Sequence, residues 1–320
     1  MAGEYIKRLM QWDTGAEIGA ESFAKLRADP RYPKAVRTFA SNMLAAGDAD
    51  RLLDGILKDA GRNVAALCAV HLHLTGGLTL PRLKALCTSF GLVSPGRARA
   101  LLLYLRYLGF VERSTMHKKG APALYVPTKR FLDTWRNHQR AVLDAVQVLE
   151  PAVALLLDRF DEAGVFETFS RKLCEAFLDA AQQTNIDTPY FRVFMHRNAG
   201  IQIMHALIAA DADDAFPPAR PIAFSLSAMA RRFRVSRIHV RRLIDAAEQE
   251  GLLRFSNDGA IVLQEQGRKA IDAVFATQMI RFLMVAARTM KARQDQAECI
   301  APAPALPLVA HTDHAAAAFG

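Results

Sequence analysis

Two segments of the chain, 142 residues apart, follow the same pattern of residues. The first reads V-S-P-G-R-A-R-A-L-L-L-Y-L-R-Y-L-G-F-V from Val93 to Val111, and the second reads V-S-R-I-H-V-R-R-L-I-D-A-A-E-Q-E-G-L-L from Val235 to Leu253. Each opens with an apolar residue and a serine, which is a preferred N-cap, continues for about four helical turns and stops at a glycine before two apolar residues. The repeat predicts two copies of one helical unit in a single chain.

The second copy carries the signals of a helix-turn-helix followed by a hairpin. Its apolar residues recur at helical spacing and predict two packed helices, with Leu226, Met229 and Phe233 in the first and Val240, Leu243, Ile244 and Ala247 in the second. After the second helix, Asn257-Asp258-Gly259 separates two apolar runs, which is the turn signal of a β-hairpin. Helix, turn, helix and hairpin is the order of elements in a winged helix.

The segment S-L-S-A-M-A-R-R-F-R-V-S-R-I-H-V-R-R-L-I-D-A-A-E-Q-E-G-L-L resembles the winged helix-turn-helix of MarR-type transcriptional regulators. The segment from Ile261 to Ile271 is similar to the strand and helix start that follow the wing in that family. The first copy, from Leu78 to Trp135, resembles the family more loosely, through its V-S opening, its G-F-V ending and Y-V-P-T-K-R-F-L after the hairpin. The resemblance implies a DNA-binding transcriptional regulator.

Two features depart from that family. Arg234 stands at the turn position that is usually glycine, which predicts backbone strain or a different turn. Family members usually carry one winged domain and pair through terminal helices, whereas this chain carries two. We expect the helices over 128–183 and 271–293 to take over that pairing role, which would make the chain a single-chain pseudo-dimer; a homodimer is the other arrangement considered.

The expected fold class is mainly α, with tandem winged helix-turn-helix domains, whose wings are small β-hairpins, joined by a long helical connector. The expected divisions are an N-terminal helical segment (1–62), a first winged helix domain (63–132), a helical connector (133–190), a second winged helix domain with its C-terminal helix (191–293) and a disordered tail (294–320). A helix from Asp50 to Gly61 is expected in the first of these, and breaks near Pro151 and Gly164 are expected in the connector.

Basic charge gathers on the two repeated units. The chain has a formal net charge of +9; residues 63–132 contain ten Lys or Arg and one acid, and residues 215–244 contain seven Arg and no acid. The connector over 133–187 has the opposite balance, with ten acids and five bases. This segregation is the pattern expected of phosphate contact, so double-stranded DNA is the predicted partner.

The second helix of a helix-turn-helix enters the major groove, and its first turns reach base edges. Arg237 and Arg241 share a face, and one of them is the best candidate for bidentate contact with guanine. Arginines just before that helix are expected to contact phosphates. The full set of predicted DNA-binding residues is Arg231, Arg232, Arg234, Ser236, Arg237, His239, Arg241 and Arg242 in the second copy, and Arg97, Arg99, Lys118 and Lys119 in the first. Because Pro95 and Ala100 replace two of these bases, the sequence also allows a first copy that serves only for packing or dimerisation.

Other sites have weaker signals. His71 and His73 point in different directions on one helix, and Cys68 with His71 is a lone spacing, so no metal or cofactor is expected. A small-molecule effector is a further candidate partner, in a pocket between helices lined by Trp135, Phe160, Phe166, Phe169 and Phe177. The widely spaced cysteines, a start without a signal-peptide core, and the lack of any stretch near ~18 uncharged apolar residues favour a soluble cytoplasmic protein without membrane contact.

Three classes of function remain open on the sequence. The leading one is a sequence-specific transcriptional regulator that uses both winged helices. The second is an architectural, replication-initiation or chromosome-segregation DNA-binding protein. The third is a helical scaffold or enzyme without DNA binding, which has little support because the chain contains no G-x-x-x-x-G-K-[ST], G-x-S-x-G or H-E-x-x-H motif.

Overall fold

A computed structural model describes residues 2–13, 18–115, 120–183, 187–210 and 215–300 of the chain. The protein is mainly helical, with 70% helix and 7% strand, and the strands form two small antiparallel sheets. The mainly α class expected from the sequence is confirmed. The chain begins with α1 (Ala2–Met10), α2 (Ala20–Ala28), α3 (Tyr32–Ala49) and α4 (Arg51–Ile56).

The first basic unit combines three helices with a small sheet. Its elements are α5 (Ala60–Leu74), β1 (Leu78–Thr79), α6 (Leu80–Ser89), α7 (Pro95–Tyr107), β2 (Val111–Arg113) and β3 (Leu124–Pro127). The strand order is β1-β3-β2, and both pairings are antiparallel, with Leu78 opposite Tyr125 and Val111 opposite Pro127.

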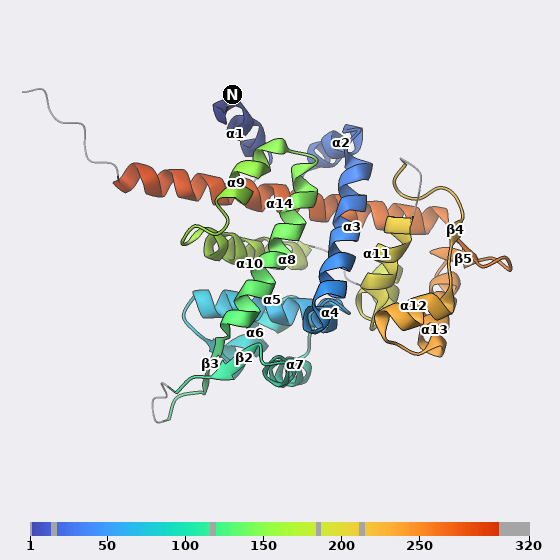
Figure 1. Cartoon of the computed structure of the whole chain (residues 1–320), viewed down its shortest axis with the longest axis horizontal. Helices are drawn as coiled ribbons and strands as arrows, with labels where there is room; N and C mark the ends of the chain where they lie inside the picture. Colours follow the sequence, from blue (N-terminus) through green and yellow to red (C-terminus); the bar gives the residue numbers. More distant parts are fainter. Residues whose placement is uncertain (1, 14–17, 116–119, 184–186, 211–214, 301–320) are drawn as a thin grey trace, which may run out of the picture.

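The second basic unit has the same order of elements, preceded by the short helix η2. It consists of η2 (Phe191–Met195), α11 (Gly200–Ala210), β4 (Ile222–Ala223), α12 (Leu226–Phe233), α13 (Arg237–Gln249), β5 (Leu253–Phe255) and β6 (Ala260–Leu263). Its strand order, β4-β6-β5, repeats that of the first unit, and the turn predicted at Asn257-Asp258-Gly259 joins β5 to β6. In Figure 1 the first unit lies at the lower left and the second at the right, so that α7 and α13 both lie along the lower edge of the view.

The segment between the two units is helical, as expected. It contains α8 (Lys129–Gln147), η1 (Pro151–Val153), α9 (Ala154–Asp158) and α10 (Val165–Gln183). The predicted breaks are confirmed: Pro151 opens a short 3-10 turn, and Gly164, with φ of 82°, precedes α10.

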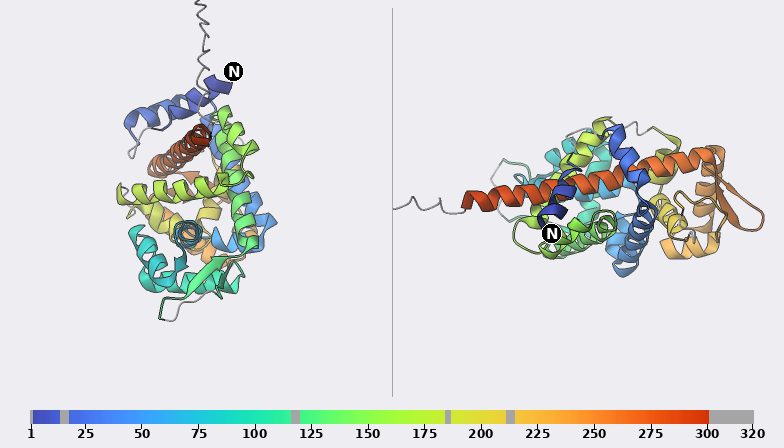
Figure 2. Two further views of the ribbon diagram at one scale, coloured as in Figure 1. Left: turned by 90° about the vertical axis from the view of Figure 1, so that its left-hand side faces the viewer. Right: turned by 90° about the horizontal axis from the view of Figure 1, so that it is seen from above.

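The final helix, α14 (Glu265–Ile300), runs along most of the length of the molecule (Figures 1 and 2) and packs against α1, α2, α8 and α10. The helix expected over 271–293 therefore starts earlier and continues past the predicted boundary at 294, and residues 301–320 of the expected tail lie outside the described residues. By length and composition alone, a stretch within Glu265–Asp295 could cross a membrane. Because this stretch contains Asp272 and Arg281, it is not an uncharged run of ~18 apolar residues, and the expectation that the chain has no such run stands. Most of this stretch, 61%, is buried inside the protein, and packing against four helices accounts for its apolar composition.

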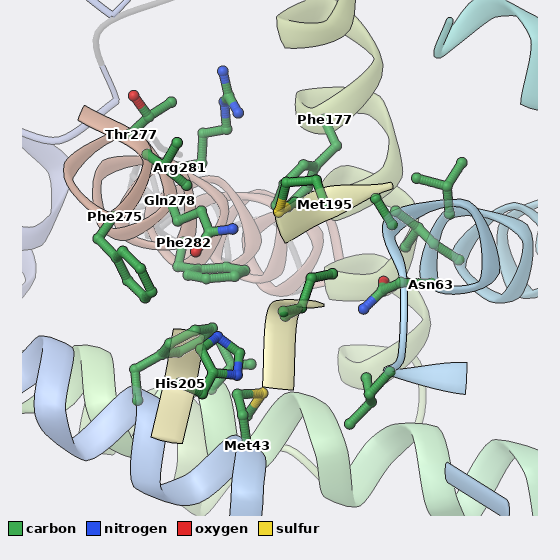
Figure 3. Close-up of a pocket in the computed structure, with 18 of the residues that line it drawn as sticks. Met43, Asn63, Phe177, Met195, His205, Phe275, Thr277, Gln278, Arg281 and Phe282 are labelled. Carbon is green, nitrogen blue, oxygen red and sulfur yellow. The ribbon is translucent and has the colours of Figure 1, made fainter. Parts of the chain in front are cut away.

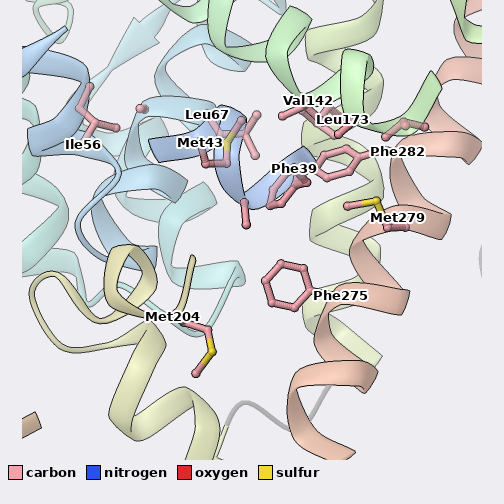
Figure 4. Close-up of a cluster of buried hydrophobic side chains, with 14 of the residues drawn as sticks. Phe39, Met43, Ile56, Leu67, Val142, Leu173, Met204, Phe275, Met279 and Phe282 are labelled. Carbon is pink, nitrogen blue, oxygen red and sulfur yellow. The ribbon is translucent and has the colours of Figure 1, made fainter. Parts of the chain in front are cut away.

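The hydrophobic core runs through the whole described molecule, and one part of it lies where α3, α10, α11 and α14 meet (Figure 4). Phe39 of α3 is at its centre, with ring centroids 6.1 Å from Phe275 and 5.9 Å from Phe282 of α14, and 5.5 Å from His205 of α11. Because these rings come from three helices far apart in the sequence, the core joins the N-terminal helices, the second unit and α14 into one body.

One predicted helix is wrong in extent. Asp50 caps α4 as expected, by accepting hydrogen bonds from the backbone of Leu52 and Leu53, but α4 ends at Ile56 and a new helix starts after Asp59. Gly61 is therefore in the first turn of α5 and does not end a helix. A Cβ atom at Gly61 would lie 3.0 Å from the guanidinium of Arg97, so this glycine permits close packing against α7.

Candidate nucleic-acid interface

The two repeated helices begin and end as their sequences predict. Ser94 caps α7 by accepting a hydrogen bond from the backbone of Arg97, and Ser236 caps α13 by accepting one from the backbone of His239. The glycines after each helix, Gly109 and Gly251, have φ of 70° and 68°. These values fall in the left-handed region that favours glycine, which explains the residue type at both helix ends.

The helix α13 buries one face and exposes another. Val240, Leu243, Ile244 and Ala247 are buried in the core, as predicted from their spacing. The opposite face exposes Arg237, Ile238, Arg241 and Arg242. Ile238 is 64% exposed, which is unusual for a large apolar side chain, and the sequence prediction did not include it. Its position outside the buried stripe was the signal that could have identified it.

The arginines of this face and of α12 differ in whether they form ion pairs or hydrogen bonds within the protein. Arg241 forms an ion pair with Asp245, with 2.6 Å between Nε and Oδ1, and lies over the ring of Phe255 on β5. By contrast, the side chains of Arg231, Arg237 and Arg242 are exposed and form no hydrogen bond or ion pair with any residue that the structure describes.

Two of the arginines predicted to contact phosphates form ion pairs with acids of the N-terminal helices. Arg232 Nη2 lies 2.8 Å from Asp48 Oδ2, and Arg234 Nη1 lies 3.6 Å from Asp54 Oδ2. Lys58 donates a hydrogen bond of 2.8 Å to the carbonyl of Phe233 in the same turn. The end of α12 and the turn before α13 are thus attached to Asp48 at the end of α3, to Asp54 in α4 and to Lys58 after α4.

Arg234 itself adopts the left-handed conformation, with φ of 51° and ψ of 50°. The strained turn expected from a non-glycine residue at this position is confirmed. Asp54, its partner, is buried, and burial raises the pKa of this carboxyl above its ordinary value despite the opposing effects of Lys58, Gln202 and Arg234.

His239 holds α13 against the segment before α11. A ring nitrogen, Nε2, lies 2.7 Å from the carbonyl oxygen of Asn198, and Arg197 donates a hydrogen bond of 3.3 Å to the carbonyl of Arg242. In this structure the His239 side chain anchors α13, and the exposed Ser236 hydroxyl caps it.

The first unit presents a smaller basic surface. Arg97 is bound to Asp59, with 2.7 Å between Nη2 and Oδ1, whereas Arg99 is exposed and has no ion pair with the described residues. The exposed side of α7 also carries Leu103, which is 49% exposed, and Tyr107, which is 85% exposed. Lys118 and Lys119 lie outside the described residues.

Three cysteines that are far apart in the sequence meet in the interior. Cys68, Cys87 and Cys174 are all buried, and Cys87 and Cys174 lie close enough to Cys68 to influence its pKa. The proximity of Cys68 and His71 lowers the pKa of the Cys174 thiol below its ordinary value. Even so, the described part of the chain contains no group of three or more His, Cys, Asp or Glu residues able to hold a metal ion.

The aromatic residues suggested as pocket lining divide into two groups. Trp135, Phe169 and Phe177 line a cavity of about 410 Å³ in the helical core. Phe160 and Phe166 instead pack against each other, with centroids 6.0 Å apart.

Comparison of the chain with protein-family models, curated proteins and solved structures finds no match in any of the three.

Proposed function

We propose that the protein is a sequence-specific DNA-binding transcriptional regulator that reads duplex DNA with α13. The observation that carries the proposal is the exposed face of α13, where Arg237, Ile238 and Arg242 project from a helix whose other face is buried. An α-helix fits the major groove of B-DNA, and arginine can pair in bidentate fashion with the O6 and N7 atoms of guanine. An exposed isoleucine on the same face suits contact with a thymine methyl group.

The surroundings of α13 support the same function. Arg231 is exposed on α12, where a side chain would meet the DNA backbone rather than a base. Both units have the order helix, strand, helix, helix and two strands, with the same strand order in each sheet. That order supports the interpretation of both units as winged helices, as does the resemblance of the second to MarR-type regulators.

The first unit has one of two roles in this proposal. If α7 also reads DNA, through Arg99, one chain binds two unlike half-sites about one helical turn apart, ~10 bp from centre to centre. If it does not, its exposed Leu103 and Tyr107 suit a contact between two chains, which would then bind a palindrome. The mass of the complex on a selected site distinguishes the two.

The test uses the full chain and a randomised duplex library, followed by fluorescence anisotropy on the selected sequence at several salt concentrations. Changing Arg237 and Arg242 together to Ala should weaken binding by about 1–3 kcal/mol for each base that the variant no longer reads. The matched control changes Arg159 and Arg171 of the connector to Ala, which removes the same charge. Equal weakening by both pairs would refute the role of α13.

Mapping of bound sites in the genome then separates the two DNA-binding classes. Scattered sites near promoters support regulation, whereas a single origin or broad coverage would indicate replication or architecture. A selection that enriches no sequence, with no salt-dependent binding to duplex DNA, would overturn both.

A further inference from the structure

The helical core contains a cavity that the proposed DNA-binding function does not use. Its volume is about 410 Å³, within the range of small-molecule sites. It lies between α3, α8, α10, α11 and α14 (Figure 3). Along α14 the lining extends from Ala270 to Phe282, which corresponds to about 18 Å of helix. The cavity is therefore long enough for an extended ligand.

The walls are predominantly apolar. They include Phe39, Met43, Phe177, Met195, Phe275 and Phe282. His205, which faces Met43 in Figure 3, belongs to the same wall, because its ring packs edge-on against Phe39 and burial lowers its pKa to about 3. A neutral imidazole between aromatic rings presents no charge to a ligand.

One arginine, and no lysine, occurs among the described residues of the lining. Arg281 lies over the ring of Phe177, with 5.6 Å from the guanidinium carbon to the ring centroid, and it forms no ion pair or hydrogen bond with the described residues. Burial lowers its pKa to about 10, so it remains charged at neutral pH. A partly buried cation without an anion is costly, and a ligand that supplies one would recover that cost.

The acids of the lining do not meet this need. Asp54 contacts Gln202, Lys58 and Arg234, and Asp48 is paired with Arg232. Gln278, one turn before Arg281 on α14, has a side-chain amide that points toward His205 in Figure 3, away from the Arg281 guanidinium. Arg281 is therefore the charged donor of the described lining that is left to pair with a ligand carboxylate.

We propose that this cavity binds a long-chain monocarboxylate, whose carboxylate contacts Arg281 and whose hydrocarbon chain extends along the apolar wall toward Met43. A hydrocarbon without an acid would leave Arg281 uncompensated, and a polar ligand such as a sugar would find few partners on these walls. The proposal is independent of DNA binding, because none of its contacts involves the exposed face of α13.

Titration of the full chain with saturated fatty acids of graded length, below the concentrations at which they form micelles, tests this. Binding is measured by calorimetry and by the fluorescence of Trp135, which lines the cavity, in a Trp12→Phe background that removes the other tryptophan. The expected result is one bound molecule per chain and an affinity that rises about fourfold per added methylene until the chain fills the cavity.

Two comparisons test the orientation. Dodecanoate should bind about tenfold more tightly than dodecanol, and Arg281→Gln should remove that difference while Arg281→Lys restores part of it. Met43→Phe, at the far end from Arg281, should shift the preferred chain length to shorter acids without changing the preference for acid over alcohol. Circular dichroism confirms that each variant is folded.

Binding of many molecules per chain, an equal affinity for dodecanoate and dodecanol, or an acid preference that survives in Arg281→Gln would overturn the proposal. So would the absence of binding by every acid in the series. None of these results bears on DNA binding, which is measured separately.

Discussion

The ion pair between Arg97 and Asp59 predicts that Arg97 stabilises the fold rather than contacting DNA. Asp59 is buried, with 3% of its surface exposed, and its Oδ1 accepts from the guanidinium of Arg97 at 2.7 Å and from the backbone of Arg62 at 3.0 Å. Its Oδ2 lies 3.1 Å from Arg62 Nε. One carboxylate therefore caps α5 and also fastens α7 to it.

The magnitude follows from burial. A hydrogen bond to a charged group contributes about 1.5–3 kcal/mol, but the Arg97 side chain is 38% exposed and Asp59 keeps Arg62 as a partner, so Arg97→Ala should cost about 1–2 kcal/mol. Asp59→Ala removes the cap and both arginine interactions and should cost about 3–4 kcal/mol. In the double variant the total cost should fall short of the sum by about 1 kcal/mol, because the same ion pair is counted in both single variants.

Urea denaturation followed by circular dichroism measures these free energies of unfolding, and anisotropy on the selected duplex measures affinity. Arg99→Ala is the matched control, because Arg99 is on the same helix, is exposed and has no ion pair with the described residues. Arg97→Ala should lower stability and leave affinity unchanged. The reverse result, wild-type stability with an affinity about tenfold lower, would show that Arg97 leaves Asp59 to contact DNA.

Three further predictions concern other parts of the molecule. Asp48→Asn releases Arg232 from its ion pair and should raise DNA affinity up to about fivefold in anisotropy, since exposed pairs contribute about 0.2–1 kcal/mol; unchanged affinity would mean that Arg232 does not contact DNA. Burial lowers the pKa of His138 to about 4 and that of His205 to about 3, whereas the pKa of both is about 6.5 in the unfolded chain. The unfolded state therefore binds more protons between these values. The free energy of unfolding should fall as pH decreases from about 6.5 toward 4, by up to about 1.4 kcal/mol per pH unit for each histidine. Equal urea midpoints at about pH 7 and pH 5 would contradict this. Ser236→Ala removes the cap of α13 and should cost about 1 kcal/mol in the same denaturation assay, and an unchanged free energy of unfolding would mean that the cap contributes nothing.

The sequence predicts those features whose causes are local. Ser236 and Gly251 mark the start and end region of α13 because a cap and a left-handed glycine act within a few residues of the helix end. Pro151 and Gly164 interrupt the connector for similarly local reasons. The buried stripe of α13 follows from helical spacing alone.

The sequence does not predict which arginines remain available. Arg97 and Asp59 are 38 residues apart, and Arg232 and Asp48 are 184 residues apart, so neither pair leaves a trace in local spacing. The role of Gly61 is hidden for the same reason, because its small size serves packing against a distant helix. The number of basic residues in a sequence thus overestimates the number of arginines that a folded domain can present.

The turn at Arg234 connects the two proposals. A left-handed arginine costs about 1 kcal/mol relative to glycine, and the first unit has Gly91, with φ of 69°, in its own turn. The arginine at this position forms an ion pair with Asp54, and both Asp54 and Phe233 also line the cavity. A ligand that moved Asp54 would therefore weaken or strengthen its ion pair with Arg234, in the turn that precedes α13. Because coupling between two sites is reciprocal, DNA that shifts the turn must change the affinity for the ligand by the same factor by which the ligand changes the affinity for DNA. The ion pair between Arg234 and Asp54 and the side chain of Phe233 are the contacts through which either effect would reach the other site.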